Sequence, residues 1–377
     1  MTLTETAIAP GPDAEAPPPV LKILLPLPHR LNCFLRLWLL KFLATVFYAL
    51  DRLMHPPPPS IRPTLIKHYP CRPKLQTRVF FPPNYSSLSG TLLPTYLSIH
   101  GGGFAVGDPQ QDDEWCTMWA KRTGHLVISL DYSKAPLSTF PAPVYDVAAL
   151  ATAVIEDASL PIDKSKISMG GFSAGANLAL CASQLPPLRG LIKAAIVYYP
   201  IVNWDHTPAD KLARRPYKTG PKDNLAEASY WFDWAYVPAQ TNRRHPLLSP
   251  YHTDKSNLPP WIYMIAAEWD MLRLEAQIMV HELAGTNLHL RDAEHPEDFE
   301  AGTYKWTLAK KCRHGFTHHF GLKAEVKKKR EEKCKPIYDE AVEWIAKALE
   351  STTTTSSTEE EKKIKGSLNE ERAGVVI

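Results

Sequence analysis

Six short apolar runs alternate with stretches of helical character between residues 75 and 350, and this alternation constrains the fold more than any other feature. Parallel neighbouring strands need a crossover connection, which is usually a helix. The alternation therefore predicts an α/β fold, a mainly parallel sheet with helices on both faces. The expected strands are residues 78–81, 95–99, 125–130, 166–169, 194–199 and 261–266.

Composition sets the outer limits. The chain has 377 residues, of which 44% are hydrophobic and 22% charged. A chain of this size and apolar content can bury one large core, so a single α/β domain with a lid is expected in preference to two independent domains. The net charge is only +3 and no basic stripe with interleaved aromatic residues occurs, so nucleic acid is not an expected partner.

The cysteines are scattered along the chain without paired spacing. Zinc sites and disulfide frameworks both have recognisable cysteine spacings, which are missing here. We therefore interpret the cysteines as reduced thiols of a cytoplasmic protein, and we expect neither a metal nor a cofactor. The six residues are Cys33, Cys71, Cys116, Cys181, Cys312 and Cys334.

The stretch Gly171-Phe172-Ser173-Ala174-Gly175 lies between the strand expected at 166–169 and a stretch of helical character. In this context Gly-x-Ser-x-Gly indicates a nucleophile elbow, a strained strand-to-helix turn that exposes a serine hydroxyl. The two glycines leave room where a Cβ atom would clash in so tight a turn. The alternative for Ser173 is an ordinary structural turn, since glycine and serine are common in loops.

The stretch His100-Gly101-Gly102-Gly103 follows the strand expected at 95–99. Consecutive glycines leave backbone N–H groups unshielded, and such groups stabilise the oxyanion that forms when a serine attacks an ester carbonyl. The alternatives are a flexible loop and a phosphate cradle. A phosphate-binding P-loop continues with Gly-Lys-Ser/Thr, which does not follow here, so the oxyanion interpretation is favoured.

Together these motifs resemble those of the hormone-sensitive-lipase-like branch of the α/β-hydrolases. That branch carries His-Gly-Gly-Gly, then Asp-Tyr-x-x-Ala-Pro, then a Phe-Pro-Ala segment, then Gly-Asp-Ser-Ala-Gly-Gly-Asn. The matching segments here are residues 100–103, 131–136, 140–146 and 171–177. Phe172 stands where the family usually has Asp, and Ala176 where it has Gly. Neither position carries the chemistry, so we expect altered packing at the elbow and retained activity.

The resemblance implies that the catalytic residues follow one another in the order serine, acid, histidine. It assigns the acid to Asp270, which follows the strand expected at 261–266 and stands two residues before a leucine, as in the family. An acid at this place would orient the histidine and stabilise its imidazolium. Glu268 is the competing carboxylate, and Glu275 resembles a flanking acidic position with a structural role.

The resemblance assigns the base to His314, because the family carries its histidine in a His-Gly-Phe or similar loop. Asp270 and His314 are 44 residues apart, which is more than is usual in the family. We expect the excess in an inserted acidic loop at 295–300, since closure entropy grows only slowly with loop length. The rival histidines are His295, His318 and His319.

By correspondence with the family, the backbone N–H groups of Gly102, Gly103 and Ala174 would hold the oxyanion. The resemblance implies a serine carboxylic-ester hydrolase that acts through an acyl-enzyme on small to medium apolar esters, with acetate esters among the candidates. One alternative is a membrane-associated lipid or xenobiotic deacetylase. Another is a non-catalytic ligand receptor on the same fold, although such receptors lack the triad histidine.

The other segments are assigned from composition and from the resemblance. Residues 1–28 and 351–377 are expected to be disordered tails around a hydrolase domain at 75–350. Residues 29–74 are expected to form an N-terminal amphipathic helix and cap segment. Residues 201–258 break the alternation and include an aromatic-rich helix expected at 223–236. In the family such an insertion and the N-terminal segment together form a helical cap over the active site.

Residues 30–54 are strongly apolar but contain Arg36 and Lys41, which are costly inside a membrane span. On a helical wheel one narrow arc holds the polar residues Arg30, Lys41, Thr45 and Arg52, which leaves a wide apolar face. We expect this amphipathic helix either to cover the active site as a lid or to lie in a lipid interface. No signal-peptide pattern is recognised, so a cytoplasmic protein is expected, with membrane-surface association through residues 30–54 as an open alternative.

Overall fold

The computed structural model describes residues 25–83, 85–217, 219–286, 288, 297–318 and 324–373, with the backbone alone described for residues 89, 324 and 352–373. Its centre is a nine-stranded sheet in the order β1-β2-β4-β3-β5-β6-β7-β9-β8. The strands are β1 (Leu65–His68), β2 (Gln76–Phe80), β3 (Leu93–Ile99), β4 (Leu126–Leu130), β5 (Ile162–Phe172), β6 (Ile192–Tyr198), β7 (Trp261–Trp269), β8 (Phe299–Ala301) and β9 (Tyr304–Arg313). The run from β4 to β9 is parallel, whereas β1 and β2 at one edge and β8 at the other pair antiparallel.

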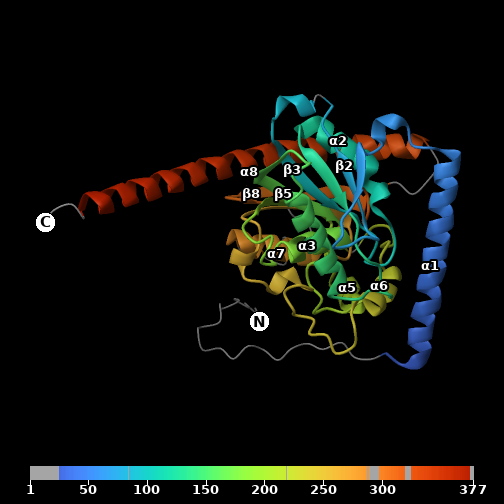
Figure 1. Cartoon of the computed structure of the whole chain (residues 1–377). Helices are drawn as coiled ribbons and strands as arrows, with labels where there is room; N and C mark the ends of the chain where they lie inside the picture. Colours follow the sequence, from blue (N-terminus) through green and yellow to red (C-terminus); the bar gives the residue numbers. More distant parts are fainter. Residues whose placement is uncertain are drawn as a thin grey trace, which may run out of the picture.

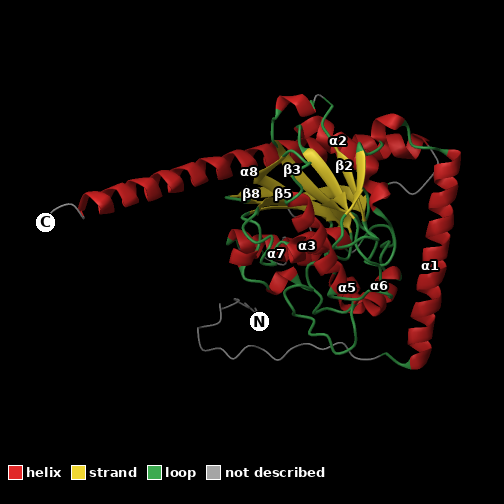
Figure 2. Ribbon diagram, in the orientation of Figure 1, coloured by secondary structure: helices red, strands yellow, loops and turns green. Residues whose placement is uncertain are grey.

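The helices connect these strands and cover the sheet (Figures 1 and 2). The α-helices are α1 (Leu27–Met54), α2 (Asp113–Thr123), α3 (Ala142–Ile155), α4 (Ala174–Ala182), α5 (Pro208–Arg214), α6 (Ala228–Tyr236), α7 (Arg273–Ala284) and α8 (Ala324–Ala373). Short 3-10 helices are η1 (Pro59–Ile61), η2 (Ser87–Ser89), η3 (Pro109–Asp112), η4 (Pro250–His252) and η5 (Lys255–Asn257).

Alternate side chains of the central strands point into two separate cores, because successive residues of a strand face opposite sides of the sheet. Tyr96 of β3 packs with α2 and α8 on one face. Its neighbour Leu97 packs with α3 and α4 on the other face, which α7 also covers. The predicted α/β fold, a mainly parallel sheet with helices on both faces, is confirmed.

Three strands were not expected from the sequence. β1 is short and exposed, and β8 and β9 form a hairpin in which Phe299 pairs with Trp306 and Glu300 with Lys305. The prediction of an inserted acidic loop is therefore wrong at Phe299 and Glu300, which are strand residues. Lysines interrupt the apolar pattern of β9 and hid this strand from the periodicity. His295 lies outside the described residues, so the beginning of that loop stays a prediction.

The cap elements lie over the carboxyl ends of the parallel strands. α5 and α6 come from the insertion expected at 201–258, and α1 runs along one side of the molecule beside α6 (Figure 1). α6 begins at Ala228, five residues later than expected, because the preceding segment from Asp223 forms a turn in which Asp223 Oδ1 accepts a hydrogen bond from the N–H of Leu225.

Helices extend into both of the predicted disordered tails. α1 begins at Leu27, inside the tail expected at 1–28, and residues 1–24 lie outside the described part of the chain. α8 has a helical backbone to Ala373, whereas a tail without regular structure was expected from residue 351. The division into tails, cap and hydrolase domain stays a prediction.

Candidate active site

Ser173 stands alone between β5 and α4, at the sharp turn expected for a nucleophile elbow. Its backbone has φ 53° and ψ −115°, a conformation that L-residues rarely adopt. A Cβ atom at Gly171 would lie 2.2 Å from the carbonyl oxygen of Ile99, and one at Gly175 would lie 2.1 Å from the same oxygen. Both glycines are therefore required because the end of β3 passes directly beside the elbow.

The structure brings Ser173, His314 and Asp270 together. His314 Nε2 lies 2.8 Å from Ser173 Oγ, and His314 Nδ1 lies 2.7 Å from Asp270 Oδ2. Asp270 follows β7, His314 follows β9, and both strands end at the same edge of the sheet as β5. A carboxylate only accepts hydrogen bonds, so Nδ1 carries the proton and Nε2 is left to accept from the serine hydroxyl.

Burial and a backbone hydrogen bond hold the carboxylate of Asp270 in place. Asp270 is fully buried, the His314 side chain is 9% exposed, and Asp270 Oδ1 accepts a 2.9 Å hydrogen bond from the N–H of Leu272. Low solvent access strengthens the interaction between the carboxylate and an imidazolium. The arrangement therefore suits a histidine that becomes positively charged during a reaction.

The rival carboxylates are engaged elsewhere. Glu268 Oε2 accepts a 2.5 Å hydrogen bond from the N–H of Lys311. Glu275 accepts from the N–H groups of Val202 and Asn203 and pairs with Lys211 at 2.6 Å, while burial raises its pKa. These contacts hold the first residues after β6, as expected of a structural acid.

Of the rival histidines, only His318 lies among the described residues; His295 and His319 lie outside them. His318 Nε2 lies 2.8 Å from Asp112 Oδ1, and its ring meets the ring of Phe172 edge to face at 4.5 Å. Phe172 itself is buried and stacks on Tyr198 at 4.9 Å. The residue that replaces the family's usual Asp thus belongs to an aromatic cluster beside the site.

The glycine-rich loop after β3 faces Ser173. Gly102 has φ 121° and Gly103 has φ 58°, both in the region that favours glycine. A Cβ atom at Gly102 would lie 2.0 Å from the carbonyl oxygen of Val106, and one at Gly103 would lie 2.4 Å from the Phe232 ring. Ala174 opens α4, so its N–H is among the first four of that helix, which have no partner within the helix. The positive end of the helix dipole favours negative charge at this point.

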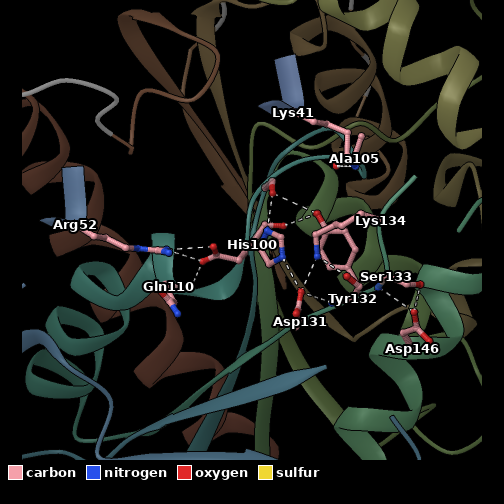
Figure 3. Close-up of polar contacts among 12 residues, drawn as sticks. Lys41, Arg52, His100, Ala105, Gln110, Asp131, Tyr132, Ser133, Lys134 and Asp146 are labelled. Atoms are coloured by element: carbon pink, nitrogen blue, oxygen red, sulfur yellow. Dashed lines mark hydrogen bonds and ion pairs between the residues drawn. The ribbon is translucent and has the colours of Figure 1, made fainter. Parts of the chain in front are cut away.

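A network of hydrogen bonds and ion pairs around His100 and Asp131 holds this loop in place (Figure 3). The buried ring of His100 stacks on Tyr132 at 4.4 Å, and its Nδ1 lies 2.7 Å from the carbonyl oxygen of Gly101. Asp131 Oδ1 accepts a 2.6 Å hydrogen bond from Lys134 Nζ and lies 3.4 Å from His100 Nε2. Burial alone would raise the pKa of Asp131, but His100 and Lys134 lower it to about 2. Asp131 is therefore a fixed negative charge that orients the residues before the glycines.

Helix α1 is bonded to the same loop (Figure 3). Lys41 Nζ donates to the carbonyl oxygens of Ala105, at 2.6 Å, and Ala135, at 2.9 Å. Arg52 donates to both carboxylate oxygens of Asp108 at 3.1 Å. Burial and then the charge of Lys134 lower the pKa of Lys41. The helix expected to be either a lid or an interfacial segment is thus attached to the loop that carries Gly102.

The cap is also attached to the acid and histidine loops. Asp223 Oδ2 accepts a 2.6 Å hydrogen bond from the N–H of Met271, the residue after Asp270. Asn224 Nδ2 donates to the carbonyl oxygen of His314 at 3.1 Å. Burial and the charge of Asp270 raise the pKa of Asp223. No sequence motif includes Asp223 or Asn224, so this role could not be predicted.

A cavity of about 560 Å³ opens above Ser173 between the hydrolase core and the cap. Its walls are mostly apolar and come from α1, α6, the glycine-rich loop and the acid loop. Its lining includes Leu40, Leu43 and Phe47 from α1, Phe232 from α6, and Leu225 from the turn before α6. Apolar walls around a few convergent polar groups are typical of a small-molecule site.

The described residues contain no group of three or more His, Cys, Asp or Glu side chains arranged to hold a metal ion. The geometry described above is that of a serine paired with an oriented histidine beside backbone donors. Such an arrangement can carry out acyl transfer.

The chain matches a known protein family and is similar to several curated proteins. The alpha/beta hydrolase fold family matches residues 96–297, which include Ser173 and Asp270. An acetyl-hydrolase of Streptomyces hygroscopicus is 30% identical over 211 residues, 54% of this chain and 67% of the relative. An arylesterase of Saccharolobus solfataricus is 30% identical over 205 residues, 53% of this chain and 65% of the relative.

The chain thus spans about two thirds of the length of these two curated relatives, 67% and 65%. Among solved structures, an esterase of Pyrobaculum calidifontis is 26% identical, with a TM-score of 0.60 over 80% of this chain and 93% of that one. A thermophilic carboxylesterase cloned from a metagenomic library, 24% identical, shares the fold with a TM-score of 0.63 over 83% of this chain and 97% of that one. The chain belongs to the alpha/beta hydrolase fold family, in its hormone-sensitive-lipase-like branch.

Proposed function

We propose that the protein is a serine carboxylic-ester hydrolase that acts through an acyl-enzyme on small to medium apolar esters. The observation that carries this proposal is the pair of hydrogen-bond distances at His314, 2.8 Å to Ser173 Oγ and 2.7 Å to Asp270 Oδ2. Relatives named acetyl-hydrolase and acetyl esterase support ester chemistry, with acetate esters as a candidate substrate class.

In the proposed mechanism His314 Nε2 accepts the proton of the Ser173 hydroxyl, because an unaided serine is a weak nucleophile near neutral pH. Ser173 Oγ attacks the acyl carbon, and the N–H groups of Gly102, Gly103 and Ala174 receive the oxyanion. Collapse of the tetrahedral intermediate breaks the bond to the alcohol, which leaves with the proton from His314. Water, activated by the same histidine, then releases the acid and restores the serine.

The size and lining of the cavity support an apolar substrate. A volume of about 560 Å³ falls within the usual range of ligand pockets, about 300–1,000 Å³. Aromatic and aliphatic side chains from the cap form its walls, and the acyl chain or alcohol of an apolar ester would be desolvated there. This supports esters with a sizeable apolar part over charged substrates.

A non-catalytic receptor is disfavoured on one observation. His314 is present, its side chain is almost fully buried, and it stands within hydrogen-bond distance of Ser173. A binding pocket has no need for a buried imidazole aligned on a serine. We further propose a cytoplasmic location, with association with membrane surfaces through α1.

Hydrolysis of p-nitrophenyl esters of increasing acyl length tests the proposal. We expect turnover of the acetate and of medium chains, with kcat/KM passing through a maximum set by the cavity. Absence of turnover across the whole series, together with specific binding of an apolar ligand, would favour the receptor function instead. Turnover of amides or thioesters at comparable kcat/KM would widen the substrate class while keeping the same serine chemistry.

A further inference from the structure

Helix α1 has the reverse of the polarity that a surface helix of a globular protein normally shows. Such a helix packs its apolar stripe on the core and turns its charged face to water. In α1 the outward stripe is apolar, and each of its members is more than a third exposed. These residues are Leu31, Leu35, Leu39, Phe42, Val46, Leu50 and Leu53.

The polar groups in the middle and at the end of α1 are turned toward the protein or used within the helix, whereas His29 and Arg30 in its first turn are exposed. Lys41 donates to two carbonyl oxygens beside the glycine-rich loop, and Arg52 binds Asp108. Arg36 lies 3.8 Å from Glu227 and 5.7 Å from the centre of the Trp231 ring. Thr45 donates its hydroxyl to the carbonyl oxygen of Lys41. The outer stripe is therefore left without a charge that would attract a charged partner.

The helix lies flat along the enzyme. Cys33 and Leu37 are buried, and the contacts with the protein continue to Arg52. At 1.5 Å per residue this docked length is about 28 Å. Although α1 is long and apolar enough to cross a membrane, a docked helix cannot do so without breaking the bonds of Lys41 and placing that cation in hydrocarbon.

The shape of the stripe fits a plane better than a second helix. Its members follow one another at spacings of 4, 4, 3, 4, 4 and 3 residues, an 11-residue repeat that stays nearly parallel to the axis of a straight helix. The common left-handed coiled coil of two copies keeps a seven-residue repeat and a narrow seam, and an 11-residue repeat would need the less usual right-handed supercoil. With Phe34, Trp38 and Leu43 at its sides, the exposed apolar face covers about half of the circumference at 100° per residue.

The outer face is continuous with the catalytic cavity. Leu43 is 54% exposed and also lines the cavity, together with its neighbours Leu40 and Phe47 on the same helix. An apolar molecule at the outer face of α1 therefore meets an apolar rim on its way to Ser173.

We propose that α1 lies in the interfacial layer of a lipid bilayer, with its outer stripe in the acyl-chain region and the hydrolase domain on the aqueous side. We infer further that apolar esters dissolved in this layer enter the cavity past Leu43, and this second step rests on the proposed ester hydrolase function. The basic residues that anchor α1 are bonded to the enzyme, so apolar burial drives the contact and anionic lipids are not required.

Flotation with vesicles of neutral phosphatidylcholine tests the lipid contact. The full-length Ser173→Ala protein is used so that catalysis does not enter the result. We expect it to float with the vesicles, with little change between low and high salt. Leu35→Gln/Leu39→Gln should lower the vesicle-bound to free ratio by about tenfold or more, because apolar area is lost from the stripe. The matched control, Leu88→Gln/Leu92→Gln, changes two leucines exposed elsewhere and should float as the parent does.

Failure of the parent to float, or equal flotation of both double variants, would overturn the proposal. A dimer in solution that the α1 variant dissociates, without vesicle binding by the parent, would assign the face to a second copy instead. Circular dichroism of each variant shows whether it is folded.

A second measurement separates the two steps. Leu35→Gln/Leu39→Gln in the otherwise wild-type chain should keep its turnover of soluble p-nitrophenyl acetate, because neither residue lines the cavity. Its turnover of a long-chain p-nitrophenyl ester dissolved in vesicles should fall about tenfold or more, in line with its lost binding. Equal turnover of the vesicle-dissolved ester by variant and wild type would contradict entry from the lipid. A wild-type protein that floats but hydrolyses no ester would refute the proposed function and leave the lipid contact standing.

Discussion

The carboxylate of Asp223 in the cap accepts a 2.6 Å hydrogen bond from the N–H of Met271, the residue that follows Asp270. A second cap residue, Asn224, donates to the carbonyl oxygen of His314. The insertion that covers the cavity therefore also holds the loops that carry Asp270 and His314. The position of the cap and the alignment of these two side chains are physically linked.

Replacement of Asp223 by alanine should reduce kcat more than it changes KM. The N–H groups of Met271 and Leu225 would lose a buried acceptor, which costs about 1–3 kcal/mol and is enough to let the acid loop shift. A shift of that energy corresponds to a loss of rate of about fivefold to somewhat over a hundredfold, at about 1.4 kcal/mol per factor of ten. Steady-state kinetics with p-nitrophenyl acetate measures it.

The matched control is Asp223→Asn, whose side-chain oxygen can still accept from Met271. It should retain most of the rate that the alanine variant loses. Identical kcat values for the two variants would show that the contact does not position Asp270.

Gly102→Ala should lower kcat by about 10² to 10³, the usual cost of losing one oxyanion donor. The added Cβ atom would lie 2.0 Å from the carbonyl oxygen of Val106, so the loop must move away from its present path. Gly124→Ala is the control, because Gly124 also has positive φ, at 72°, but a Cβ atom there would meet nothing within 4 Å. A loss of rate in the control equal to that of Gly102→Ala would point to general destabilisation as the cause.

His125 should make the protein less stable in mild acid. Its side chain is buried, and burial lowers its pKa to about 4, against about 6.5 in the unfolded chain. Between these values the unfolded chain binds a proton that the native protein does not. Stability that is present above pH 6.5 is therefore lost as the pH falls toward 4, by about 3 kcal/mol in total.

Urea unfolding at pH 7, 5.5 and 4.5, for the wild type and for His125→Gln, measures this contribution. The free energy of unfolding of the wild type should fall more steeply with decreasing pH than that of the variant. Parallel pH profiles for the two proteins would exclude His125 as a source of acid sensitivity.

Motifs whose conformation depends on a few neighbouring residues could be predicted from the sequence. The elbow around Ser173 and the loop at Gly102 depend on glycines that a few neighbouring residues require, and both lie where expected. Asp270 and His314 follow the ends of strands, so the order of a parallel sheet brings them to one edge. Even the unusual chain length between them did not alter this placement.

Features that depend on contacts between residues distant in the sequence could not be predicted in this way. The hairpin of β8 and β9 was missed because lysines interrupt the apolar pattern of β9 and weaken the signal of a strand. The contact of Asp223 with Met271 and the pairing of His318 with Asp112 join residues that share no motif. For α1, the wheel showed which residues share a face, but only the structure shows that the basic arc faces the protein.

Labelling with a fluorophosphonate followed by mass spectrometry tests whether Ser173 is the acylating nucleophile. The wild-type protein should gain a single adduct on the peptide that contains Ser173 and lose its turnover of p-nitrophenyl acetate. The Ser173→Ala protein, folded by circular dichroism, should gain no adduct and show no turnover above background. Turnover by Ser173→Ala at the wild-type rate would contradict the account.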